Sequence, residues 1–108
     1  MTIGELKTIL ESIEGFSEKV CYFAWPESAA PELPFICFYT PDSDNFAADN
    51  IVFHNINHFY VELYSQYKDT ASEALIEAAL DRAGVFWNKD SDYIEDERCF
   101  ITAYQMEV

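Results

Sequence analysis

The most constraining feature of this sequence is a run of alternating residues from His58 to Tyr67. Successive side chains of an extended chain point to opposite faces of a sheet. One face of this run therefore begins with three apolar side chains, and the other mixes aromatic with polar side chains. The apolar set is Phe59, Val61 and Leu63, and the mixed set is Tyr60, Glu62, Tyr64 and Gln66. The pattern predicts a strand that turns one face toward a hydrophobic core.

Two segments have the sequence signals of helices that could cover such a face. Each opens on a capping box, in which a hydroxyl and a carboxylate satisfy backbone N–H groups at the helix start, and each is followed by a glycine that can end it. The boxes are Thr2 to Glu5 and Thr70 to Glu73, and the glycines are Gly15 and Gly84. We expect both helices to be amphipathic.

Apolar runs bounded by turn residues predict the remaining strands. They are Val20–Phe23, Phe35–Thr40, Ile51–His54, Tyr93–Asp96 and Cys99–Met106. We expect a hairpin whose turn is Asn55–Asn57, joining Ile51–His54 to the alternating run, and a second hairpin over Asp96–Arg98. The proline-rich stretch 24–34 and the polar stretch 41–50 are expected to be irregular.

These elements predict an α+β fold for a single domain spanning residues 1–108. Its order is α-β-β-β-β-α-β-β, with an antiparallel sheet and two helices packed on one face. The length is typical of one domain with one core.

Charge excludes several classes of function. The chain has 20 Asp and Glu residues against 6 Lys and Arg residues, which gives a net charge of −14. Tight nucleic-acid binding and attachment to anionic membranes both require clustered basic residues. No apolar run is long enough to cross a bilayer, and no secretion signal is recognisable. We therefore expect a soluble, cytoplasmic protein.

The residues that could carry chemistry form no recognisable catalytic or metal motif. Asp42, Asp44 and Asp49 are potential calcium ligands, but the stretch departs from the EF-hand loop. His54 and His58 could approach each other across the expected hairpin, although histidines without metal are the simpler interpretation. We expect no cofactor and no enzymatic activity.

The cysteines and tryptophans also have simple interpretations. The three cysteines, Cys21, Cys37 and Cys99, are widely spaced, which favours free thiols, and spacing does not exclude a Cys–His nucleophilic pair. Trp25 and Trp87 could be binding platforms, with a role in the core or at an interface as the simpler alternative.

Aromatic residues are more numerous than one small helix-covered sheet needs. They lie along the alternating run and in the segment before it, and the set is Phe46, Phe53, Tyr60, Tyr64 and Tyr67. A second surface that another subunit or partner covers would account for them. This favours assembly over catalysis.

Several strings resemble the small tail-completion or head–tail joining proteins of tailed bacteriophages and of prophages in Gram-positive bacteria. The strings are P-D-S-D-N-F-A-A-D-N from residue 41, F-Y-V-E-L-Y-S-Q-Y-K-D from residue 59, E-A-L-I-E-A-A-L-D-R-A-G-V-F-W from residue 73, Y-I-E-D-E from residue 93 and Y-Q-M-E-V from residue 104. The N-terminal helix and the aromatic and proline-rich stretch 23–34 fit as well. These are patterns of apolar and turn residues, and none is a catalytic signature.

The resemblance implies a non-enzymatic virion component that assembles as a ring, expected to be hexameric, between the tail tube and the head connector. Its partners would be copies of itself and those neighbouring proteins. It would occupy the bacterial cytoplasm during assembly and the neck or tail of the finished virion. The isolated chain could still be a monomer. The segments 42–50 and 51–67 are the expected contact regions.

The charge gains a role if such a ring surrounds DNA. Acidic side chains that line the channel would repel phosphates and let DNA slide. The candidates are Asp42, Asp44, Asp49, Glu95, Asp96 and Glu97. The same acids could instead only confer solubility. A second class of function also fits the composition, namely an acidic DNA mimic that occupies the basic cleft of a nucleic-acid-binding protein.

Overall fold

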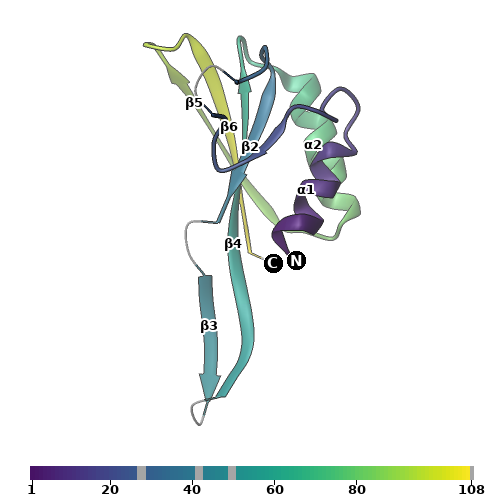
Figure 1. The fold of residues 1–108 in the computed structure, drawn as a ribbon, viewed down its shortest axis with the longest axis vertical. Coiled ribbons are helices and arrows are strands. Elements are labelled where there is room, and N and C mark those ends of the chain that lie inside the picture. The colour runs from purple at the N-terminus through teal and green to yellow at the C-terminus, as the bar shows by residue number, and fades with distance from the viewer. Residues whose placement is uncertain (27–28, 41–42, 49–50, 108) are drawn as a thin grey trace.

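The longest strand, β4 (Ile51–Ser65), runs along most of the length of the molecule (Figure 1). The structure is a computed structural model that describes residues 1–26, 29–40, 43–48 and 51–107, and it describes side chains for all of these except 43–48 and 51–57. The other elements are α1 (Ile3–Glu11), β1 (Val20–Tyr22), β2 (Phe35–Tyr39), β3 (Ser43–Ala48), α2 (Thr70–Arg82), β5 (Trp87–Ile94) and β6 (Cys99–Glu107).

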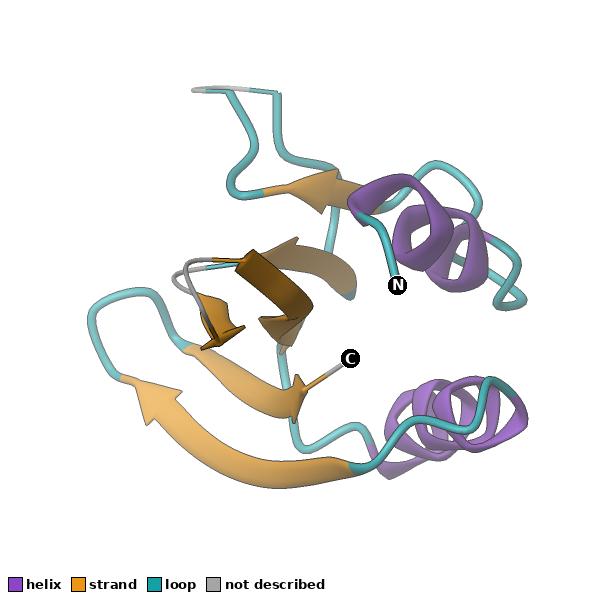
Figure 2. Ribbon diagram, turned by 90° about the horizontal axis from the view of Figure 1, so that it is seen from below, coloured by secondary structure: helices purple, strands orange, loops and turns teal. Residues whose placement is uncertain are grey.

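The main sheet has the strand order β1-β2-β4-β6-β5, and β3 pairs with β4 beside this path. Both helices lie on the same side of the sheet (Figure 2). The α+β class and the helix placement are therefore confirmed. The expectation of a wholly antiparallel sheet is wrong at one edge, because β1 pairs with β2 in parallel. The connection over residues 23–34 carries the chain back to the end where β1 starts, as a parallel pair requires.

The core lies between the helices and the apolar face of β4. Phe59, Val61 and Leu63 are fully buried, as the alternation predicted. Leu6 and Leu10 from α1 meet this face, and buried residues of α2, β1, β2, β6 and the segments that follow the two helices complete the cluster. Alternation along β4 thus decides which face of the sheet the helices cover.

The helix ends follow the sequence signals with two exceptions, and one of them is that α1 ends at Glu11, with Ser12 as its cap, four residues before the expected stop at Gly15. The Thr2 hydroxyl caps α1 by accepting a hydrogen bond from the Glu5 N–H at 3.1 Å. In α2 the cap is Asp69, whose carboxylate accepts from the Ser72 N–H at 3.1 Å. The expected capping box from Thr70 is therefore wrong. Glu73 turns under the helix instead, where only 3% of it is exposed.

The expected turn at Asn55–Asn57 is also wrong, because β4 continues straight through it. The hairpin lies one element earlier. Part of the stretch expected to be irregular forms β3, which pairs with β4 from Ser43↔Asn57 to Ala48↔Ile51. Asparagine favours turns by bonding its own backbone, and a partner strand that satisfies those backbone groups removes the advantage.

The second hairpin has the expected turn but a longer first strand. β5 begins at Trp87, six residues before the predicted Tyr93, and ends at Ile94 before the turn 95–98. Its side chains from Asn88 to Tyr93 are exposed. A strand at the edge of a sheet can be polar on both faces, so its sequence lacks the alternation that identifies β4.

Candidate interaction surfaces

The first candidate surface is an arm, which we define as β3 together with residues 51–57 of β4. It projects from one end of the body (Figure 1). Within the described chain, β3 pairs with β4 alone. Residues 51–57 span about 23 Å at the usual rise per residue, in a molecule whose longest dimension is 50 Å. A two-stranded ribbon of this kind is at best marginally stable without other contacts.

The arm contains several of the residues that the sequence singled out. The backbones of Asp44 and Phe46 lie in β3, and that of Phe53 lies in β4. The side chains of these three residues fall outside the described part of the structure, as do Asp42 and Asp49 altogether. Their predicted roles in contacts or in a lumen therefore stay predictions.

The second candidate surface is the face of the sheet opposite the helices, which we call the open face. Its residues form three rows across β2, β4, β6 and β5. The rows are Phe35–Tyr64–Ile101–Asp92, Cys37–Glu62–Ala103–Asp90 and Tyr39–Tyr60–Gln105–Asn88. Neither helix covers these rows in the described chain (Figure 2). The structure thus places Tyr60 and Tyr64 on one surface, as their spacing predicted.

Aromatic pairs border a single carboxylate at the centre of the open face. The rings of Phe35 and Tyr64 are stacked with centroids 5.0 Å apart, and those of Tyr39 and Tyr60 meet edge to face at 5.3 Å. Glu62 lies on β4 between these two pairs. The Tyr64 hydroxyl donates a hydrogen bond to Glu62 Oε1 at 3.0 Å.

Two phenols of the open face, Tyr39 and Tyr64, have a raised pKa and stay neutral across the physiological pH range. Burial raises the pKa of Tyr64, and the charge and hydrogen bond of Glu62 raise it further. Burial and the Glu62 carboxylate likewise raise the pKa of Tyr39. The hydroxyl of Tyr64 therefore remains a proton donor to the carboxylate.

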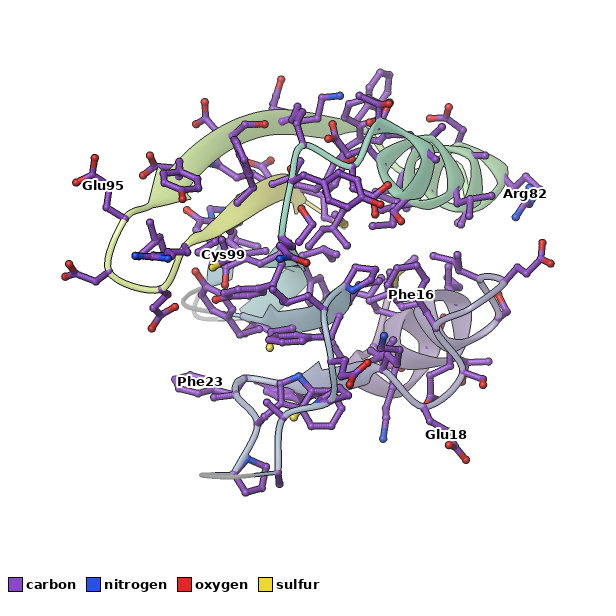
Figure 3. All side chains as sticks on the ribbon, turned by 90° about the horizontal axis from the view of Figure 1, so that it is seen from above. Phe16, Glu18, Phe23, Arg82, Glu95 and Cys99 are labelled. Carbon is purple, nitrogen blue, oxygen red and sulfur yellow. The ribbon has the colours of Figure 1, made fainter. Side chains whose placement is uncertain are left out.

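Further aromatic residues extend the open face toward β1. Trp25 packs edge to face on Phe35 at 6.0 Å, and Phe23 packs on Tyr39 at 5.9 Å. Phe23 is 70% exposed and projects away from the helices, whereas Phe16 lies inside near the helical layer (Figure 3). Trp25 thus belongs to this surface.

A hollow of about 560 Å³ adjoins the last row of the open face, near the base of the arm. It is lined by His58, Tyr60, Phe86, Asn88, Gln105, Met106 and Glu107. Phe86 is 93% exposed. His58 Nε2 lies 3.7 Å from a carboxylate oxygen of Glu107.

The acids predicted to line a channel are not all brought together. Glu95, Asp96 and Glu97 are exposed in the turn between β5 and β6, and Glu95 points outward at its tip (Figure 3). This turn lies at the end of the molecule opposite the arm, which contains Asp44 (Figure 1). Tyr67 lies beyond the end of β4, outside the three rows of the open face, and is 66% exposed.

The structure contradicts the idea that His54 and His58 meet across a turn. Both lie on the continuous strand β4, where a four-residue separation corresponds to about 13 Å. Among the described residues, no group of three or more His, Cys, Asp or Glu side chains is arranged to hold a metal ion.

The three cysteines are free thiols, as expected. Cys37 and Cys99 are buried, and Cys21 is half-buried opposite Cys37 in the β1–β2 pair. Burial, with smaller effects of Cys21 and Glu62, raises the pKa of Cys37 to about 11. Such a thiol is a poor nucleophile at neutral pH.

Sequence reasoning missed a polar cluster beneath α2. Lys89 lies on the helix side of β5, where its Nζ is 3.2 Å from Glu73 Oε1 and 2.9 Å from Glu77 Oε2. Lys68 approaches the other oxygen of Glu73 at 2.8 Å, and the Tyr104 hydroxyl donates to Glu77 at 2.8 Å. The only available signal was a lysine in an otherwise acidic strand.

Trp87 has a structural role beside this cluster. Its ring meets that of Tyr104 edge to face at 5.5 Å, and its Nε1 donates to Asp81 at 2.9 Å. The core interpretation of Trp87 is therefore the right one.

Comparison with known proteins places the chain in no family. No family model matches the sequence, and no curated protein is significantly similar to it. Among the described residues, none of the helices has the length and apolar character needed to span a membrane.

Proposed function

We propose that this protein is a non-enzymatic component of the neck of a tailed bacteriophage or prophage, acting in tail completion or head–tail joining. The observation that carries the proposal is the arm, since its β3 pairs with no described strand outside it. A ribbon that its own domain does not support is best stabilised by contacts with another chain.

The arm and the open face suit association in a ring. A contact between two different surfaces of identical subunits is heterologous, and such contacts generate closed rings when the rotation permits. The arm leaves the body at one end, and the open face lies on the body itself (Figure 1). We expect a ring, hexameric in the assembled particle, in which each subunit presents both surfaces to its neighbours or to the tail-tube and connector proteins.

The net charge of −14 supports a position beside DNA without tight binding. Repulsion between lumen acids and phosphates would keep the DNA mobile. Because the acids 95–97 and the arm lie at opposite ends of the molecule (Figure 1), the two predicted acidic sets would line different levels of the neck. We infer that the protein is made in the bacterial cytoplasm and remains in the virion neck or tail.

Deletion of the gene from its phage or prophage tests the proposal. Electron microscopy should show filled heads separate from tails, and added purified protein should restore complete particles. Normal virions from the deletion strain would contradict the joining role.

A variant without the arm sharpens the experiment. Tyr39 and Tyr60 are paired, so a two-residue Asn-Gly turn that replaces residues 41–58 would close β2 and β4 as an ordinary hairpin. This variant should fold, judged by circular dichroism, and fail to restore joining. A matched variant with Glu95, Asp96 and Glu97 changed to Gln, Asn and Gln keeps the arm, so it should restore joining, and slower DNA ejection from its particles would place these acids in the lumen.

One observation favours the DNA-mimic alternative. Exposed acids run along the outer edge of the body from Asp90 and Asp92 in β5 to the turn 95–97. A mimic would form a salt-sensitive complex with a basic nucleic-acid-binding protein, as a monomer or dimer, and its gene would not be needed to join heads to tails.

A further inference from the structure

We propose that the open face binds an arginine-bearing basic segment of a different protein, with the guanidinium on Glu62 between the two aromatic pairs. This inference concerns the chemistry of a partner and holds whether or not that partner belongs to a virion.

The geometry around Glu62 suits a guanidinium. Residues two apart on a strand are separated by about 7 Å, so the Phe35–Tyr64 and Tyr39–Tyr60 pairs stand on either side of the carboxylate. One carboxylate oxygen accepts from Tyr64. A carboxylate offers about four lone-pair sites, which leaves capacity for the two parallel hydrogen bonds of an arginine. Aromatic rings within about 6 Å attract the same cation through their faces.

Charge selects the kind of partner. The rows of the open face, which the structure describes in full, contain Glu62, Asp90 and Asp92 and no lysine or arginine. Two open faces of identical chains would bring these carboxylates together, and each chain has a net charge of −14. Like-charge contacts are strongly unfavourable at an interface. The occupant is therefore a basic segment of another protein, and pairing of this face with the open face of a second copy is unfavourable.

The hollow beside the last row gives the segment a place to continue. It begins at Tyr60, Asn88 and Gln105 and holds the carboxylate of Glu107. Its volume of about 560 Å³ is within the usual range for sites that enclose small molecules or side chains. A peptide with one arginine on Glu62 can place its next basic residue here.

Arginine fits this face better than lysine does. A guanidinium is planar, stacks on aromatic rings and binds a carboxylate through two donors, whereas an ammonium is a strongly hydrated point charge. The two aromatic pairs favour the planar cation. We therefore expect discrimination between the two residues at equal peptide charge.

The experiment titrates the isotope-labelled protein with the peptide acetyl-Ala-Arg-Ala-Arg-Ala-amide and follows amide shifts by NMR. The largest shifts should fall on residues 35–39, 60–64 and 101–105. The Glu62→Gln variant retains an acceptor for Tyr64 and should bind roughly tenfold more weakly, as expected for the loss of a charge-assisted hydrogen bond. Glu95→Gln removes an equal charge in the turn and should bind like the wild type. The same peptide with lysine in place of arginine should bind several-fold more weakly.

Tyr60→Leu is a second variant, which retains an apolar side chain but removes the aromatic face, and it should also weaken binding. Equal effects of Glu62→Gln and Glu95→Gln would overturn the inference, since binding would then reflect net charge alone. Shifts centred on residues 90–97 would overturn it in favour of an acidic edge that mimics DNA. Equal affinity for the arginine and lysine peptides would refute the role of the aromatic pairs.

Discussion

Lys89→Met tests the polar cluster beneath α2 most directly. The substitution keeps much of the apolar stem and removes the ammonium that contacts both Glu73 and Glu77. Because the Glu73 side chain is 4% exposed, solvent cannot replace the lost partner. The variant should therefore be less stable than the wild type.

The size of the loss follows from the partners that remain. Leaving a buried charge uncompensated costs about 3–5 kcal/mol. Here Lys68 still holds the other oxygen of Glu73 at 2.8 Å, and the Lys89 side chain is 35% exposed. Both facts reduce the expected loss to about 1.5 kcal/mol. For a domain of this size, that lowers the melting temperature by about 5–10 °C.

The loss should also depend on pH. Partial burial opposes ionisation of Glu77, but hydrogen bonds from Lys89 and Tyr104 outweigh it and lower the pKa of that carboxyl. A carboxyl whose pKa is lowered by folding stabilises the protein above its unfolded pKa, and this contribution is lost as the pH falls through the folded pKa. The difference between wild type and variant should therefore be full at pH 7 and shrink below about pH 4.

Thermal melts followed by circular dichroism measure this difference. Lys7→Met is the control, because it makes the same chemical and charge change on the exposed side of α1. If both variants lose the same stability at pH 7, the loss reflects net charge and the cluster contributes nothing specific.

Two further predictions use matched pairs. Gly84→Ala should lower the free energy of unfolding by about 1 kcal/mol, because Gly84 follows α2 at φ +72 and a new Cβ meets open space, so the cost is backbone strain alone. Gly4→Ala inside α1 should raise the free energy of unfolding by about 0.5–1 kcal/mol. Urea denaturation measures both changes, and changes of the same sign would contradict the backbone argument. At pH 8 iodoacetamide should modify half-buried Cys21 well before Cys37, because burial raises the pKa of Cys37 to about 11. Mass spectrometry of digests measures the two rates, and a guanidinium-unfolded sample is the control. Equal rates for both thiols in the folded protein would refute the prediction.

The sequence predicted the parts of the fold that a core dictates. Alternation at Phe59, Val61 and Leu63 determined the buried face, and Gly84 marked the end of α2 with φ +72. These features leave a periodic or conformational trace in the sequence. The open face was predictable for the same reason, because the aromatic set of β4 alternates with its core set.

The arm and the long β5 could not be predicted this way. Within the described chain β3 pairs with β4 alone. Its sequence, S-D-N-F-A-A, shows no alternation, and Asn55 and Asn57 resemble a turn. The predicted capping box of α2 is wrong because Glu73 does not reach back to the helix start. It pairs instead with Lys68 and Lys89 under the helix. Long-range ion pairs leave no local pattern in a sequence.

The continuity of β4 has a mechanical consequence. The strand that forms one side of the arm is also the centre of the sheet, where it is bonded to β2 on one side and to β6 on the other. Antiparallel hydrogen bonds lie perpendicular to the strands, so tension along β4 from the tip would load both ladders in shear, with many bonds sharing the force. The arm is therefore anchored at the centre of the sheet, and a pull on it is resisted by the hydrogen bonds of both ladders.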